Sequence, residues 1–216
     1  MTKETKAMIK TVVYNEMEKR RSHSWKEQGN KYYHGERVAS IALKLRKHIF
    51  PDVTEYDDVL EVAAWFHDIC NGEAMHNERG AETAKAILAP YLEEKELDLI
   101  YYIIYSHDKR SPDGTDYEFY LKLHQDADLL DHYGCFDIWT EMFHSAAMGA
   151  NVHHMITYLE FERPGTADGE RRLLNYDISR EIFDDKAKFL KQFADRFLEE
   201  CTTGIANEEK FFGKKL

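Results

Sequence analysis

A histidine and an aspartate stand side by side directly after an apolar stretch, in the segment AAWFHDI at residues 63–69. Both side chains are costly to bury, because an unpaired buried polar group costs about 1–3 kcal/mol and a buried charge costs more. His67 shares a helical stripe with Leu60 and Ala64, so it faces the interior. Asp68 and His67 could simply cap the helix, but together they also have the chemistry of metal ligands.

Other polar residues share this placement on interior faces. His34 lies on one stripe with Val38, and His107 follows Ile103 by one helical turn. Asp128 lies within the segment HQDADLLD. Several buried polar groups that converge need a shared partner, and neutral imidazoles and carboxylates are usual ligands of divalent metals. The pattern therefore predicts a divalent metal site.

Helical periodicity runs through most of the chain, and no hairpin signal interrupts it. Helices are expected at about residues 3–21, 31–49, 54–66, 77–88, 93–106, 116–132, 135–148 and 178–200. Thr54 is the expected N-cap of the third helix, and residues 99–105 alone would also suit a strand. Residues 109–115 are expected to form a loop and residues 164–170, PGTADGE, a turn. The predicted fold class is all-α.

Composition narrows the class of protein. The chain is 43% apolar and 32% charged, as in ordinary soluble domains. Its net charge of −11 argues against binding to nucleic acid or to an anionic membrane, but is compatible with a small anionic substrate. No apolar run approaches the roughly 18 residues of a membrane span, and the N-terminus lacks the apolar core of a signal peptide. We therefore expect a cytoplasmic protein.

The order of these polar residues resembles that of the HD-domain superfamily of metal-dependent phosphohydrolases. The resemblance rests on His34 in YYHGERVASIALKL, the pair His67-Asp68, and Asp128 in DADLLDHYG, and covers about residues 30–135. It implies an all-α fold, a divalent metal (Mn, Fe, Mg, Ni, Co or Zn) bound by these four residues, and Asp68 as the catalytic residue. Residues 136–216 are then a C-terminal helical extension within one domain spanning residues 1–216.

Two more histidines extend the resemblance. His76 in HNERGAE and His107 in IIYSHD resemble the additional histidines of dinuclear members of the superfamily. In that arrangement Asp68 bridges two metals, and His76 and His107 hold the second ion. The protein is accordingly expected to bind one or two metals per chain. The alternative for His76 is a surface residue at the start of a helix.

The last ligand has two candidates. Asp126 and Asp128 are two residues apart, so on a helix they point in nearly opposite directions and only one can reach the metal. Helical spacing favours Asp126, which shares a stripe with Leu123 and Leu130. The family pattern favours Asp128, which we take as the ligand. Asp131, one turn further on, is expected to be a surface acid.

The resemblance implies hydrolysis of a phosphate ester, because a metal lowers the pKa of bound water toward 7 and polarises a phosphoryl oxygen. Arg37, Lys109 and Arg110 are the candidate phosphate-binding residues, with solvated surface charge as their alternative. The expected partner is a small phosphorylated substrate, such as a nucleotide, and a homodimer is left open. Two other functions remain: a diiron oxygenase of the HD type, and a metal-binding regulatory module without turnover.

The remaining histidines receive no role from the sequence. His124, His132 and His144 fall on mixed faces of their predicted helices. The pair His153-His154 starts a helix beyond the matched region and lacks an obvious third metal ligand. Aromatic residues of the C-terminal third, such as Trp139 and Phe143, are expected to serve core packing rather than stacking on a nucleobase.

Overall fold

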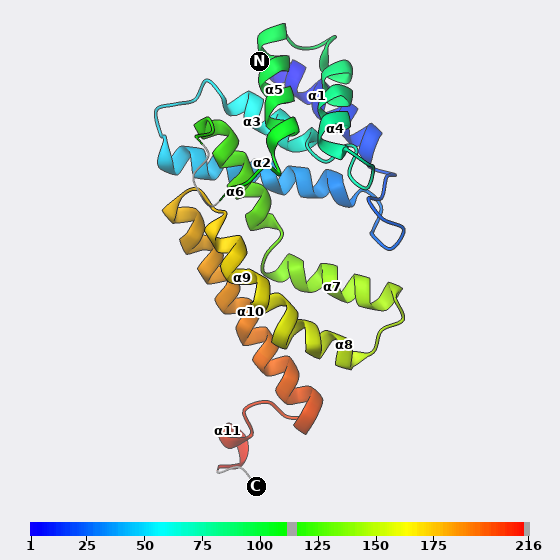
Figure 1. Cartoon of the computed structure of the whole chain (residues 1–216), viewed down its shortest axis with the longest axis vertical. Coiled ribbons are helices and arrows are strands. Elements are labelled where there is room, and N and C mark those ends of the chain that lie inside the picture. The colour runs from blue at the N-terminus through cyan, green and yellow to red at the C-terminus, as the bar shows by residue number, and fades with distance from the viewer. Residues whose placement is uncertain (112–115, 214–216) are drawn as a thin grey trace.

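The computed structural model describes residues 1–111 and 116–213, which form helices and connecting segments without a strand (Figure 1). The all-α prediction is confirmed. The helices are α1 (Lys3–Met17), α2 (Asn30–Ile49), α3 (Asp57–Phe66), α4 (His76–Leu88), α5 (Glu94–Ser106), α6 (Phe119–Asp131), α7 (Cys135–Ala147), α8 (Val152–Thr157), α9 (Arg163–Arg172), α10 (Asp177–Thr203) and α11 (Glu208–Phe212). Within this described part, no helix has the length and apolar character that a membrane span requires.

Two local predictions are wrong, and one ambiguity is settled. Helix α3 begins at Asp57 with Tyr56 as its N-cap residue, so the prediction of Thr54 as the N-cap is wrong. Residues 99–105 belong to helix α5, as the helical pattern of residues 93–106 predicted. The turn expected at residues 164–170 is helical, since these residues belong to α9 with Pro164 in its first turn. Of the predicted loop at 109–115, residues 109–111 are non-helical, and 112–115 lie outside the described residues.

The core that positions the site lies between α2, α3, α5 and α6, in the upper part of Figure 1. Val38, Leu60 and Ile103 are fully buried there. Helices α2 and α3 approach closely at Gly35, where a Cβ atom would lie 2.7 Å from the backbone oxygen of Ala64. Only a glycine fits this contact, and it brings the beginning of α2 against the end of α3.

The C-terminal helices form the lower part of the molecule in Figure 1, with the long helix α10 packed against α6, α7, α8 and α9. One buried carboxylate connects the two parts. Asp126 on α6 accepts hydrogen bonds from the backbone N–H groups of Asn175, at 2.8 Å, and Tyr176, at 3.1 Å, directly before α10 begins. This contact fixes the start of α10 against the core.

Candidate metal centre

Five of the six predicted metal ligands come together in the interior. Their side chains are all buried and come from the beginning of α2, the ends of α3 and α5, and the last turns of α6: His34, His67, Asp68, His107 and Asp128. Their ligand atoms fall into two groups, each within 4.8 Å. The first group is His34, His67 and Asp128, and the second is His67, Asp68 and His107.

Hydrogen bonds fix the orientation of the three imidazole rings. Nδ1 of His67 donates to the backbone oxygen of Ala64 at 2.8 Å, and Nδ1 of His107 donates to that of Ile104 at 2.7 Å. Because a carbonyl oxygen only accepts, Nδ1 carries the hydrogen in both rings, and Nε2 is directed into the site. Nδ1 of His34 lies 2.7 Å from Asp131 Oδ2. Donation of this kind to an outer partner is typical of metal-binding histidines.

Both carboxylates of the centre are held in the ionised form. Burial alone would raise the pKa of Asp68, but the charges of His67 and Lys31 outweigh burial and hold that pKa well below 3.8. For Asp128, burial is outweighed by the charge of Arg110 and by the hydrogen bond from His34, so its pKa is also well below its usual value. Two carboxylates therefore remain available as anionic ligands.

The histidines differ in their protonation. Burial, followed by the charge of His67, lowers the pKa of His107 to about 4, so this ring is neutral at pH 7. Burial also opposes protonation of His67, but the charges of Asp68 and Asp128 outweigh it and raise its pKa. Metal binding requires a neutral imidazole, so a metal ion must compete with a proton at His67.

This donor set fits a divalent cation. Nε2 of His34 lies 3.2 Å from Nε2 of His67 and 3.0 Å from Oδ1 of Asp128, separations of the size found between ligands of one ion. Imidazole nitrogens together with carboxylate oxygens suit Zn, Fe and Mn. Lys31 already supplies a positive charge here, because its ammonium forms an ion pair with Oδ2 of Asp68.

In a comparison with known protein families, residues 32–133 match the family model of the HD domain. The chain contains an HD domain. Among solved structures, it is similar to an HD-superfamily hydrolase from Bacillus thuringiensis, with 21% identity over 93% of this chain and 98% of that chain and a TM-score of 0.66. The chain is also similar to Bacillus subtilis YpgQ in complex with ADP, with 20% identity over 94% of this chain and 97% of that chain and a TM-score of 0.63.

A third similar structure is a predicted HD-superfamily hydrolase from an uncultured Thermotogales bacterium, with 22% identity over 90% of this chain and 92% of that chain and a TM-score of 0.59. No curated protein matches the sequence. The similarity thus extends beyond the HD domain to the C-terminal helices. HD domains bind divalent metals, which agrees with the donor set of this chain.

The structure distinguishes the two aspartate candidates on α6 of the HD domain. Asp128 faces His34 and His67, whereas Asp126 is directed away from them and is occupied by Asn175 and Tyr176. His76, at the start of α4, has its ring centroid 5.8 Å from that of His107. Its nitrogens belong to neither of the buried ligand groups found among the described residues.

The three predicted phosphate-binding residues occupy different places in the HD domain. Arg37 binds Asp131 through Nε, at 2.8 Å, and Nη2, at 2.9 Å. Arg110 donates to Asp128 Oδ2 at 2.5 Å and so contacts a candidate ligand directly. Lys109 is adjacent in sequence, but its ammonium lies 3.3 Å from the ring centroid of Tyr105. The two neighbouring cations therefore have different surroundings.

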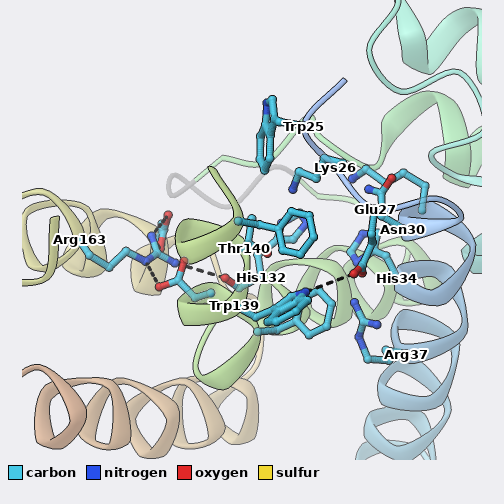
Figure 2. Close-up of a pocket in the computed structure, with 15 residues that line it drawn as sticks. Trp25, Lys26, Glu27, Asn30, His34, Arg37, His132, Trp139, Thr140 and Arg163 are labelled. Atoms are coloured by element: carbon cyan, nitrogen blue, oxygen red, sulfur yellow. Dashed lines mark hydrogen bonds and ion pairs between the residues drawn. The ribbon is translucent and has the colours of Figure 1, made fainter. Parts of the chain in front are cut away.

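A cavity of about 280 Å³ opens beside the HD metal centre (Figure 2). In Figure 2, His34 and Arg37 project from α2 toward the side of the cavity that carries Trp139 of α7. The lining combines aromatic side chains with charged ones of both signs: the aromatic residues are Trp25, Phe136, Trp139 and Phe143, the cations are Lys26, Lys31, Arg37 and Arg163, and the carboxylates are Glu27, Asp137 and Glu170. Trp139 is 46% exposed, so the expectation that it serves core packing is wrong. Aromatic surfaces and a small excess of positive side chains thus lie next to His34.

Sequence reasoning missed several groups around the metal centre. Asp131 is buried and bound to His34 and Arg37, so its assignment as a surface acid is wrong. His132 is exposed at the end of α6, and its ring stacks on that of His34 with centroids 4.7 Å apart. His124 is fully buried, with its centroid 5.1 Å from that of His67 and no hydrogen-bond partner for either nitrogen among the described residues.

A usable signal for two of these groups was their helical spacing. His124 precedes Asp128 by four residues and Asp131 follows it by three, so all three share one face of α6. Lys31 gave a weaker signal, since it lies one turn before His34 at the start of α2. None of these spacings identifies the partner on the other helices.

Proposed function

We propose that the protein is a metal-dependent phosphohydrolase that acts on a nucleotide or another small phosphate ester. The observation that carries this proposal is the convergence of three imidazoles and two carboxylates, where one of the imidazoles, that of His34, lines a cavity with aromatic and charged walls. The HD-domain fold is compatible with this chemistry in general. The substrate class is our inference from the cavity.

On this proposal, His34, His67, Asp68 and Asp128 would hold a divalent ion. A second ion would use His107 together with Asp68, with His76 as a further candidate ligand. A bound divalent ion lowers the pKa of a water toward 7 and polarises a phosphoryl oxygen. Asp68, which belongs near both groups of ligands, is the proposed catalytic residue.

The chain's own cations would bind and orient the phosphate. Arg37 lines the cavity, and its guanidinium is held by Asp131 and lies over the ring of Phe136 at 3.6 Å, so it is positioned before substrate arrives. Arg110 is proposed to keep Asp128 ionised and in place. Lys109, which lies over Tyr105, is retained as a weaker candidate for phosphate contact.

A nucleotide is the favoured substrate because of the rings in the cavity. Trp25 and Trp139 offer flat apolar surfaces, and stacking of a base on an aromatic side chain is worth about 1–3 kcal/mol. Bacillus subtilis YpgQ, of similar fold, has been crystallised with ADP. We propose a nucleotide as the substrate of this chain as well.

The test is a metal-supplemented screen of nucleotides and generic phosphate esters, with Asp68→Asn as the key variant. This change keeps the size of the side chain but removes the charge, so we expect a loss of at least about a hundredfold in kcat/KM. His48→Ala is the matched control, because His48 is an exposed histidine on the same helix as His34. We expect its activity to equal that of the wild type.

The outcomes separate the candidate functions. Release of phosphate or pyrophosphate that needs added metal and is lost in Asp68→Asn supports the proposal. An oxygen-consuming activity with the EPR signal of a mixed-valent diiron site would instead establish the oxygenase alternative. Stoichiometric metal binding without turnover of any phosphate ester would leave the protein as a regulatory module.

A further inference from the structure

A second cluster of potential metal ligands lies on α7 and α8, outside the metal centre. It consists of Glu141, His144 and His154, whose ligand atoms all lie within 4.8 Å of one another. Oε1 of Glu141 is 3.5 Å from Nδ1 of His144 and 3.2 Å from Nε2 of His154. The cluster shares no residue with the ligand groups of the HD domain.

We propose that Glu141, His144 and His154 form a separate binding site for a zinc-like divalent cation. Zinc binds imidazole nitrogen and carboxylate oxygen at about 2.0–2.2 Å, so neighbouring ligands of a tetrahedral ion lie about 3.3–3.5 Å apart. The two measured separations, 3.2 and 3.5 Å, have this size. Two histidines and one glutamate are a known zinc ligand set, with the fourth position left to water.

The surroundings of the cluster support a built site rather than a chance contact. The side chain of Glu141 is only 12% exposed, and its Oε1 also accepts a hydrogen bond from Ser145 Oγ at 3.0 Å. Outer hydrogen bonds of this kind orient ligating carboxylates. The two histidines are 38% and 40% exposed, so an ion can enter from solvent.

The position of the site suggests what the cation would do. Glu141 and His144 lie on one helix and His154 on the next, so an ion would fasten α7 to α8 across residues 148–151. The ring of His144 lies 5.0 Å from that of Trp25, which lines the cavity beside the metal centre. A cation here would thus fix the aromatic wall of that cavity, as a positioning device rather than a catalytic one.

The experiment measures zinc binding by the full chain, using competition with a chromogenic chelator and metal analysis. His154→Ala removes a ligand, and His153→Ala is its matched control, since His153 is the neighbouring exposed histidine of α8. We expect His154→Ala to bind about one zinc fewer per chain than the wild type, and His153→Ala to bind the same number. Equal stoichiometry in the two variants would overturn the proposal.

A second arm separates this site from the HD domain. In protein carrying His67→Ala, we expect about one high-affinity zinc to remain and to raise Tm, and both effects to disappear when His154→Ala is added. Glu141→Gln should weaken the remaining zinc at least about a hundredfold, since a neutral amide replaces the anionic ligand. If His67→Ala alone abolishes all zinc binding, the second site does not exist.

Discussion

Asp68 lies where the two groups of ligands meet. Its carboxylate oxygens are 3.5 Å from Nε2 of His67, 3.7 Å from that of His34 and 4.0 Å from that of His107, and Lys31 forms an ion pair with it. One anion therefore faces an ammonium group and three imidazole nitrogens. This explains why the segment AAWFHDI tolerates a carboxylate at the end of a buried helix.

The protonation of His67 should make the affinity for a metal ion depend on pH. Its pKa is raised above the usual 6.5, so the proton that a metal must displace persists above that pH. We expect apparent Mn²⁺ affinity to rise by about tenfold per pH unit until the raised pKa is passed, and then to level off. Calorimetric titration from about pH 6 to about pH 9 would measure this.

Calorimetry also supplies the check on this mechanism. In buffers of different ionisation enthalpy, metal binding in the rising range should release about one proton per ion. An affinity that is constant over the whole range, with no proton release, would show that His67 is already neutral in the metal-free protein.

The residues of the site were predictable to the extent that they lie on apolar stripes. His34 and His67 were found this way, because burial of a polar group on such a stripe is unusual enough to require a partner. Asp131 and His124 were missed because their meaning depends on partners from distant segments: Asp131 contacts a histidine 97 residues away. Spacing shows which face a residue occupies, but not what lies opposite.

At the scale of elements, the contact of α2 with α3 at Gly35 determines how closely His34 approaches His67. Gly35→Ala would place its Cβ 2.7 Å from the oxygen of Ala64 and 3.1 Å from the Cα of Trp65, so the helices must move apart. We expect a loss of about 1–3 kcal/mol in the free energy of unfolding and at least about a tenfold loss in metal affinity. Urea unfolding and metal titration would measure the two effects.

Gly169→Ala is the control for this substitution. Gly169 lies inside α9, and a Cβ there would meet nothing within 4 Å. Because alanine is the better helix former, this variant should gain up to about 1 kcal/mol in stability and keep its metal affinity. If Gly35→Ala behaves in the same way as Gly169→Ala, then the close contact of the two helices is not what positions the ligands.

Element boundaries illustrate a different limit of prediction. The segment PGTADGE has the composition of a turn, yet it continues a helical path that runs through α8, a π-helical turn at residues 158–162 and α9. Tertiary packing outweighs local preference here, since Arg163, directly before this segment, is bound by Asp137 on α7 and by Glu170, about two turns further along α9. The amphipathic helices of the core, by contrast, were found within a few residues.

At the scale of the whole molecule, Asp126 connects the HD core to the C-terminal helices. Asp126→Ala would leave the N–H groups of Asn175 and Tyr176 without their acceptor, so we expect a loss of about 2–4 kcal/mol in the free energy of unfolding. Metal affinity should stay close to that of the wild type, because Asp126 does not face the ligands. Urea unfolding and Mn²⁺ titration are the two measurements.

The control for Asp126 is Asp195→Ala on α10, where an exposed carboxylate forms an ion pair with the exposed Lys191 one turn before it. Removing such a surface pair should change stability by less than about 1 kcal/mol. A large loss of metal affinity in Asp126→Ala, without loss of stability, would instead indicate that Asp126 is a metal ligand.

The ion pair of Lys31 with Asp68 compensates a buried charge within the chain itself. The ammonium serves as a counter-ion for the carboxylate, which offsets part of the cost of burying it. If Asp68 holds a divalent ion as proposed, Lys31, which also borders the cavity, would no longer be needed to compensate its charge. The ammonium of Lys31 would then be available to the cavity instead of to Asp68. The attraction of the cavity for an anionic substrate would therefore increase after the metal has bound. The expected sequence of events is therefore ordered addition, with metal first and substrate second.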